Sequence, residues 1–372
     1  DLIGTTLLAD LGADVVVVEP PGGVSSRKFM GVSNVANLLR NKRSVGIDLK
    51  SAEGADVAEK LVEAADVVVH NFSPGTMEKL GYSYDDVREY NEDIIYCSIT
   101  GFGETGPYSE WSGYDQVVQA MSGIMWLTGE PDRKPSRVGV STIDAGSGIL
   151  AAFGVMVALW HRERTGEGQK VGGALLDTAG MFGRMYYGLF SQTGDVPRRM
   201  GHSMEGYQPM GNFATATEPI YITVANQRMW ERFCEVLDRP DWVADPAFET
   251  VDRRVEHMER LHEEIEAEFQ EHTYEELTEQ LASSGIPAGP VNDIPKAIED
   301  LKRSGSVREA TNEDGEAVIT NSPPLSFSEV EHRDVHSPGY GEHTREVLTE
   351  HGYTEEEVTA LCENESVFPE GA

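Results

Sequence analysis

The first half of the chain alternates short apolar runs with amphipathic stretches. Continuous β-branched runs at residues 14–19, 66–70 and 94–99 predict buried strands, because a strand covered on both faces loses the alternation of apolar and polar positions. Between them, residues 51–64 and 84–90 carry apolar positions at helical spacing. Strands that alternate with helices predict an α/β fold with a parallel sheet. Ligands of such sheets lie beyond the carboxyl ends of the strands.

The second half has a different pattern. Residues 144–164 predict a long apolar helix, and residues 169–176 predict a further strand. From about residue 215, charged amphipathic helices replace the short strands. We therefore predict a large domain over residues 1–200, a smaller α+β domain over 215–310, and a return to the large domain over 311–372.

Composition narrows the classes of partner. The 372 residues include 64 acidic and 30 basic ones, a formal net charge of −34, which argues against binding to nucleic acid. The acids are spread along the chain, which favours a surface adapted to molar salt over a single acidic tail. Residues 149–160, the longest apolar stretch, are too few for a membrane span and predict a buried helix. Three distant cysteines form no disulfide framework, which is typical of a reducing cytoplasm.

The loops after the predicted strands hold the candidate chemistry. Residues 101–106 match GxGxxG, but Pro107 follows where a dinucleotide-binding helix should open, so a nicotinamide dehydrogenase is the weaker interpretation. The paired histidines lack the spacing or the third ligand of a metal centre, and we predict no metal site. Asp177 directly follows the last predicted strand. On this spacing alone, helix N-capping and a functional role both stay open.

A series of segments resembles, in the same order, the characteristic segments of class III CoA-transferases, the formyl-CoA and carnitine CoA-transferase family. They are residues 37–50 (NLLRNKRSVGIDLK), 65–75 (ADVVVHNFSPG), 80–81 (LG), 101–103 (GFG), 106–107 (GP), 113–115 (GYD), 164–171 (RTGEGQKV), 285–291 (GIPAGPV) and 341–344 (GEHT). Asp144 and the glycines after it also match. No single motif is decisive, but the ordered set covers nearly the whole chain.

The resemblance implies that Asp177, eight residues after Gln169, is the carboxylate that becomes acylated. It also implies a Rossmann-like large domain, a smaller α+β domain and an interlocked homodimer. No permanently bound cofactor is expected, since the coenzyme A thioester is a substrate. The residues implied to contact this substrate are Ile47, Asp48, Leu49, Lys50, Asn71, Phe72, Ser73, Lys79, Gly101, Gly103 and Gly146.

The acids that exchange coenzyme A are less constrained. A salt-adapted metabolism favours succinyl-CoA as donor and a small dicarboxylate such as mesaconate as acceptor, and Arg184 lies shortly after Asp177 as a candidate cationic partner. An acyl-CoA racemase of the same fold would need a second base, usually His, and residues 144–148 contain none. A dehydrogenase or a CoA-binding protein without catalysis is the alternative from another class.

Overall fold

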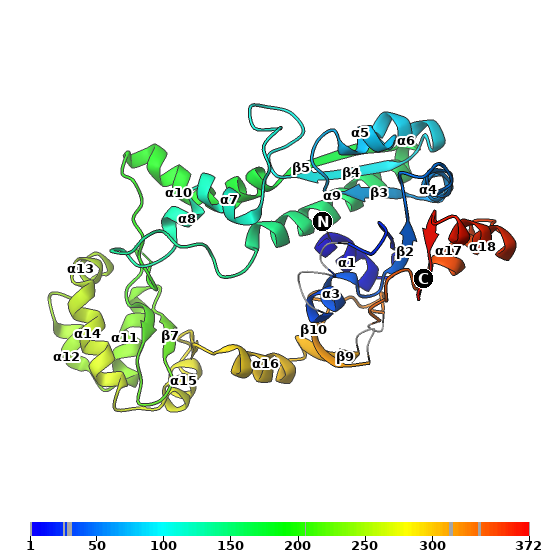
Figure 1. Cartoon of the computed structure of the whole chain (residues 1–372). Helices are drawn as coiled ribbons and strands as arrows, with labels where there is room; N and C mark the ends of the chain where they lie inside the picture. The colour runs from blue at the N-terminus through cyan, green and yellow to red at the C-terminus, as the bar shows by residue number, and fades with distance from the viewer. Residues whose placement is uncertain are drawn as a thin grey trace. The chain divides into compact units, whose positions relative to one another are not determined.

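The computed structural model describes residues 2–24, 27, 32–204, 206–311, 315–333 and 336–371. The chain divides into two compact units, whose elements are labelled in Figure 1. Unit 1 comprises Asp1–Ser122, Gly139–Met185 and Leu301–Ala372, and unit 2 comprises Gly123–Val138 and Tyr186–Asp300. Unit 2 therefore takes a short segment from the first half of the chain, although no change in the apolar pattern marks that segment.

Unit 1 combines helices with three sheets. Its helices are α1 (Leu2–Asp10), α3 (Val32–Leu39), α4 (Ala52–Ala64), α5 (Thr76–Leu80), α6 (Tyr84–Tyr90), α7 (Asp115–Met121), α9 (Thr142–Thr165), α17 (Thr344–Glu350), α18 (Glu355–Glu363) and the start of α10 (Leu175–Thr193). Its strands are β1 (Val16–Glu19), β2 (Arg43–Ile47), β3 (Val67–His70), β4 (Ile95–Thr100), β5 (Gln169–Ala174), β9 (Val307–Thr311), β10 (Ala317–Asn321) and β11 (Val367–Phe368). The predicted α/β class with a parallel sheet is confirmed.

The sheet that matters for function is β3-β4-β5, in which all strands run parallel. His70 pairs with Ser98, and Thr100 pairs with Ala174, so the three strands end at the same edge. Helix α9 packs against β4 and β5. On another side of β4, Tyr96 joins a cluster with residues of α4 and α6. A parallel sheet needs such cover because both of its faces are apolar.

Local capping explains why the helices around this sheet begin where they do. The Ser51 side chain accepts a hydrogen bond from the Gly54 N–H at 3.0 Å and caps α4. Ser83 and Asp86 form a reciprocal capping box at the start of α6. Each arrangement satisfies backbone N–H groups that a helix leaves without partners in its first turn.

A second sheet of unit 1 pairs β1 and β2 in parallel and β2 with β11 in antiparallel orientation. Its core includes Val45 and Ile47 of β2 together with Val347 and Leu348 of α17. The return of the chain to unit 1 after residue 300 thus supplies part of this hydrophobic core, through α17, α18 and β11.

Unit 2 is an α+β unit. Its antiparallel sheet has the order β6-β7-β8 (Met210–Phe213, Ile220–Thr223 and Ala288–Pro290). Its helices are α8 (Ile124–Leu127), α11 (Gln227–Val236), α12 (Pro240–Ala244), α13 (Val251–Glu256), α14 (Met258–Phe269) and α15 (Tyr274–Ser283), and α16 (Ile294–Arg303) leads back to unit 1. Stacked aromatic rings, including those of Trp230, Phe233 and Trp242, form the centre of its core.

The long apolar helix α9 departs from the sequence prediction. The stretch 149–160 was expected to be buried, yet Phe153 is 66% exposed and Trp160 is 63% exposed. The opposite side of the helix, with Ala151 and Val155, is buried against the sheet. By length and composition α9 is the one described helix that could cross a membrane, but it packs inside unit 1 against α1, β4 and β5. The burial prediction is therefore wrong for one face of α9.

Candidate active site

Three predicted site segments meet at the carboxyl edge of the parallel sheet. Residues 71–73 follow β3, Gly101 and Gly103 follow β4, and Asp177 follows β5. The Leu176 N–H donates a hydrogen bond to the Gly101 carbonyl at 3.2 Å, which ties the loop after β4 to the start of α10. The loop after β4 contains no helix before α7 at Asp115, so it lacks the helix that a dinucleotide-binding GxGxxG motif requires.

Asp177 is the third residue of α10, which begins directly after the last residue of β5. It therefore lies inside the first helical turn, and the N-capping interpretation is wrong. Its side chain is exposed, and no hydrogen bond or ion pair to its carboxylate is found among the described residues. A negatively charged side chain in the first turn of a helix interacts favourably with the helix dipole.

A hollow of about 230 Å³ lies beside Asp177. It is lined by Ile99, Ser147, Leu150, Ala151, Val171, Gly172, Gly173, Ala174, Asp177, Thr178 and Met181. Most of this lining is apolar or small. The hydroxyl groups of Ser147 and Thr178 are the exceptions, and Ser147 Oγ donates to Thr178 Oγ1 at 2.8 Å. The hollow thus combines the Asp177 carboxylate with two buried hydroxyls in a largely apolar wall.

The N-terminus of α9, in the same unit, is capped by Asp115, a residue that is distant in the sequence. Asp115 is buried, and its carboxylate accepts hydrogen bonds from the backbone N–H groups of Ile143 at 2.8 Å and Asp144 at 3.2 Å. Gln119 donates to the other carboxylate oxygen at 2.5 Å. Burial, with the nearby charge of Asp115, raises the pKa of Asp144. Asp144 is therefore a half-buried acid that α9 holds close to a second, fully hydrogen-bonded acid.

The remaining predicted site residues lie in several surroundings. Gly146 on α9 faces α10 so closely that a Cβ there would lie 2.5 Å from the Phe182 ring. Ile47 is fully buried, so only its backbone can reach a ligand. Residues 48–50 follow β2 in the other sheet, where Asp48 accepts a hydrogen bond from the Lys50 N–H at 3.0 Å. Lys79 is exposed on α5. The carboxyl edge of the β3-β4-β5 sheet therefore brings residues 71–73, Gly101, Gly103 and Asp177 together, while residues 48–50 follow a strand of another sheet.

Ionisable and aromatic side chains lie around His70, the last residue of β3. Burial lowers the pKa of the His70 imidazole, and its Nδ1 accepts a hydrogen bond from the Phe72 N–H at 3.3 Å. Phe72 is 46% exposed and stacks against His70. Lys170 of β5 forms an ion pair with Glu104 of the neighbouring loop. The edge of the sheet thus offers an exposed aromatic ring beside a neutral imidazole and a neutralised ion pair.

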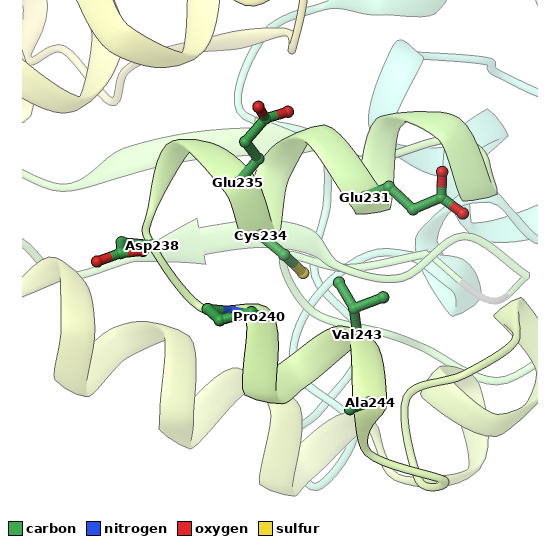
Figure 2. Close-up of a pocket in the computed structure, with 7 residues that line it drawn as sticks. All are labelled: Glu231, Cys234, Glu235, Asp238, Pro240, Val243 and Ala244. Carbon is green, nitrogen blue, oxygen red and sulfur yellow. The ribbon is translucent and has the colours of Figure 1, made fainter.

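Two other clusters carry less chemistry. Figure 2 shows a hollow of about 420 Å³ in unit 2, where Cys234 of α11 points toward Val243 of α12 and Glu235 points away. Burial raises the pKa of the Cys234 thiol to about 12, so it stays protonated and unreactive. This hollow contains no predicted site residue. Asp177 and the hydroxyls instead lie at the smaller hollow, which we take as the candidate site.

The second cluster lies at the start of α17, where ligand atoms of His336, Glu342 and His343 lie within 4.8 Å of one another. Hydrogen bonds within the protein engage these groups. His336 Nε2 is 2.7 Å from Glu342 Oε1, and the Ser44 N–H donates to His343 Nδ1 at 3.4 Å. These hydrogen bonds explain why the three side chains lie together, since they hold the loop before α17 against β2. We propose no metal site there.

The sequence prediction missed Ser147, Thr178 and Asp115. Ser147 stands in a run of small residues within an apolar helix, and an isolated hydroxyl in such a run was the one available indication. The partner of each missed residue lies about thirty positions away in the chain, so no local spacing reveals the contact.

Comparisons with known proteins agree with this geometry. The family model described as CoA-transferase family III matches residues 2–344. A succinate–glutarate CoA-transferase of Agrobacterium fabrum is 35% identical, over 92% of this chain and 90% of its own length. A succinyl-CoA–D-citramalate CoA-transferase of Chloroflexus aurantiacus is 31% identical, over 95% and 91%. A formyl-CoA:oxalate CoA-transferase of Escherichia coli O157:H7 is 32% identical, over 98% and 95%.

Solved structures point to the same fold. The crystal structure of a CAIB/BAIF family protein from Brucella suis superposes with a TM-score of 0.84 at 32% identity, covering 94% of this chain and 95% of that one. The Rv3272 protein of M. tuberculosis gives a TM-score of 0.79 at 28% identity, covering 92% and 93%. Sequence and structure therefore agree that the chain belongs to CoA-transferase family III and is an enzyme that transfers coenzyme A.

Proposed function

We propose that Asp177 is the carboxylate through which this CoA-transferase passes the acyl group and coenzyme A. Its exposure at the rim of the hollow, in the first turn of a nineteen-residue helix, is the observation that supports this role. An ionised carboxylate is the reactive form, and Asp has an ordinary pKa of about 3.9.

The reaction proceeds by covalent exchange on Asp177. A carboxylate oxygen attacks the thioester carbonyl, the C–S bond breaks, and coenzyme A leaves as a thiolate while a mixed anhydride forms. The thiolate then attacks the aspartyl carbonyl, which releases the donor acid as a carboxylate and leaves an enzyme–CoA thioester. The acceptor acid repeats these steps in reverse, so water is not consumed and the thioester energy is kept.

Backbone groups at the sheet edge support the negative charge that develops on each carbonyl oxygen. Gly101 and Gly103 lie in the loop whose Gly101 carbonyl accepts a hydrogen bond from Leu176, the residue before Asp177. The Gly103 N–H donates to Thr100 Oγ1 at 2.9 Å, so Gly101 is the candidate donor of this loop. Preorganised N–H donors at such a position stabilise an oxyanion by about 3 kcal/mol each. Segments 47–50 and 71–73 with Lys79 contact the coenzyme in this proposal, and exposed Lys50 and Lys79 are suited to its phosphates.

We infer that the exchanged acids are succinate, delivered as succinyl-CoA, and a small dicarboxylate such as mesaconate. Two relatives are named for succinate or succinyl-CoA, together with glutarate or D-citramalate. Arg184 supports this choice, because it follows Asp177 by two helical turns and therefore lies on the same face of α10, with the Cα atoms about 10 Å apart. Its guanidinium donates to the Met181 carbonyl at 3.0 Å and so folds back toward the start of the helix. There it can pair with the distal carboxylate of an acid bound at Asp177.

The exposed face of α9 supports a homodimer. Its large apolar side chains are Ile149, Phe153, Met156, Val157 and Trp160, which are 48–66% exposed. A continuous apolar face of this kind on a soluble enzyme marks an interface. The resemblance implies a second, interlocked copy of the chain as its occupant, and measurement of molar mass by light scattering tests this, with a monomer as the refuting result.

The charge and the cysteines support a salt-adapted cytoplasmic enzyme. The net charge of −34 is tolerated best where molar salt screens repulsion between acids. Cys97, Cys234 and Cys362 are all free thiols, as expected in a reducing compartment.

The role of Asp177 is tested by trapping the covalent intermediate. Wild-type enzyme mixed with succinyl-CoA and hydroxylamine should gain mass on the peptide that contains Asp177, and Asp177→Ala should lose transfer activity. Asp85→Ala is the matched control, because Asp85 is also an exposed aspartate in the first turn of a helix. It should stay active. An active Asp177→Ala enzyme would refute the mechanism.

The acid pair is tested separately with succinyl-CoA and a panel of mesaconate, glutarate, citramalate, oxalate and monocarboxylates. Arg184→Gln should raise the KM for a dicarboxylate about 10- to 100-fold, since a hydrogen bond to a charged group contributes about 1.5–3 kcal/mol. The KM for a monocarboxylate should not change. Transfer to monocarboxylates alone would exclude the dicarboxylate proposal and leave the role of Asp177 untouched.

A further inference from the structure

A chain of two hydroxyls connects α9 to the junction between β5 and α10. Ser147 is 2% exposed and Thr178 is 4% exposed. Ser147 Oγ donates to Thr178 Oγ1 at 2.8 Å, and Thr178 Oγ1 donates to the Ala174 carbonyl at 3.3 Å. Ala174 is the last residue of β5, and Thr178 is the residue after Asp177. The two hydrogen bonds therefore span the turn from which the Asp177 side chain extends.

The surroundings of this hydroxyl pair fix its geometry. The wall of the hollow around it is largely apolar, so Ser147 Oγ would lose its hydrogen bond to Thr178 if the two moved apart, while Thr178 would keep only its bond to the Ala174 carbonyl. An unsatisfied buried hydroxyl is unfavourable, which makes the paired arrangement strongly preferred. The Thr178 methyl group is also confined, because a Cβ at Gly146 would lie 3.2 Å from it. The side chain of Thr178 is thus held both by hydrogen bonds and by packing against α9.

Asp177 itself has no such restraint. Its carboxylate is exposed and finds no partner among the described residues, so its position depends on the backbone of the first helical turn. A nucleophile that must meet a thioester carbonyl and then be attacked itself needs a fixed backbone, because a displacement of about 1 Å can cost roughly 100-fold in rate.

We propose that Ser147 and Thr178 are positioning residues, whose hydrogen bonds hold the first turn of α10 so that Asp177 points into the substrate site. This inference rests on the proposed role of Asp177. Neither hydroxyl takes part in bond making. They act by restricting the turn at the end of β5, and the rate of Asp177 acylation depends on them.

The test compares two substitutions of one residue. Thr178→Val keeps the shape of the side chain but removes the hydroxyl, and Thr178→Ser keeps the hydroxyl but removes the methyl group. In rapid mixing with succinyl-CoA, Thr178→Val should acylate Asp177 about 10- to 100-fold more slowly than wild type. Thr178→Ser should stay within about threefold of wild type. The KM for succinyl-CoA should change less than twofold in both, because neither hydroxyl is assigned to the coenzyme.

Thermal unfolding and the wild-type control separate the possible outcomes. A purely structural role predicts that activity follows the melting temperature in both variants, and that result would overturn the inference. Equal acylation rates in wild type and Thr178→Val would also overturn it. If the wild-type enzyme shows no acylation of Asp177, the proposed role of Asp177 as nucleophile is refuted. The wild-type control gives this result independently of the variants. Ser147→Ala, which removes the donor on α9, should slow acylation in the same direction as Thr178→Val.

Discussion

Replacement of Gly101 by alanine should damage both stability and turnover. A Cβ on Gly101 would lie 2.6 Å from the Cα of Gly113 and 3.0 Å from its nitrogen. Ordinary carbon–carbon contacts are about 3.5–4.0 Å, so the two backbone segments must separate by roughly 1 Å. Neither segment is free to move. Phe102 is buried against Tyr108 and Trp111, and the Gly101 carbonyl accepts the hydrogen bond from Leu176.

The expected magnitude follows from this overlap. Insertion of one methyl group into a packed site costs about 1–3 kcal/mol. For a domain of about 150–250 residues, each kcal/mol lowers the melting temperature by roughly 2–4 °C. Because Leu176 precedes Asp177, a shift of the Gly101 carbonyl also displaces the candidate nucleophile. Turnover should therefore fall about 10- to 100-fold at a temperature where the variant remains folded.

Gly188→Ala on α10 is the matched control. Apart from its chain neighbours and its own helix backbone, no described atom lies within 4 Å of a Cβ built at Gly188, and alanine in a helix is favoured over glycine by about 1 kcal/mol. This variant should melt at or above the wild-type temperature and keep its activity. Differential scanning calorimetry and a coupled CoA-transfer assay measure both effects. A Gly101→Ala enzyme with wild-type melting temperature and turnover would refute the reasoning from the close approach of Gly113.

Three further predictions concern stability. Burial lowers the pKa of Lys42 to about 7 in the folded protein, whereas a lysine in an unfolded chain has a pKa of about 10.4. Between these two pH values the unfolded state binds more protons than the folded state, so the free energy of unfolding should rise with pH. Lys42→Met should flatten that rise in denaturant titrations at pH 7–10. Arg40 forms an ion pair with buried Asp10 at 2.7 Å, so Arg40→Met alone should cost about 3–5 kcal/mol, whereas Arg40→Met combined with Asp10→Leu should recover most of the loss. The melting temperature should rise as KCl is raised to molar concentration, and a fall would contradict the assignment of the acidic surface to salt adaptation.

Elements whose limits are set by neighbouring residues were predicted well from the sequence. The predicted helix at 84–90 and the structural α6 (Tyr84–Tyr90) coincide, because a capping box at Ser83 fixes its start. The strands β3 and β4 lie within one residue of their predicted limits, since β-branched runs define buried strands. The parallel strands predicted from the sequence already identify the sheet edge that carries the candidate site.

Features that depend on distant pairs could not be predicted in this way. The sequence does not indicate that Asp115 caps α9, that Gly101 crosses Gly113, or that Ser147 meets Thr178, because each contact forms only when separate elements pack. The exposed side of α9 was missed for a related reason. A sequence with apolar residues on every side of a helix predicts full burial. It does not show whether the second face packs within the same chain or is exposed at the surface of that chain, as it is in α9.

Asp177 illustrates how surroundings distinguish one aspartate from the many others in a chain. With 64 acids in the chain, one exposed aspartate at the start of a helix is ordinary, and its charge alone indicates nothing. Three independent features converge on Asp177: the carboxyl edge of a parallel sheet, a largely apolar hollow beside the carboxylate, and a turn held by buried hydroxyls. An apolar wall strengthens electrostatic interactions by excluding water, and a fixed turn limits the positions that the carboxylate can adopt. Loss of the turn should therefore reduce acylation even though the aspartate and its charge remain.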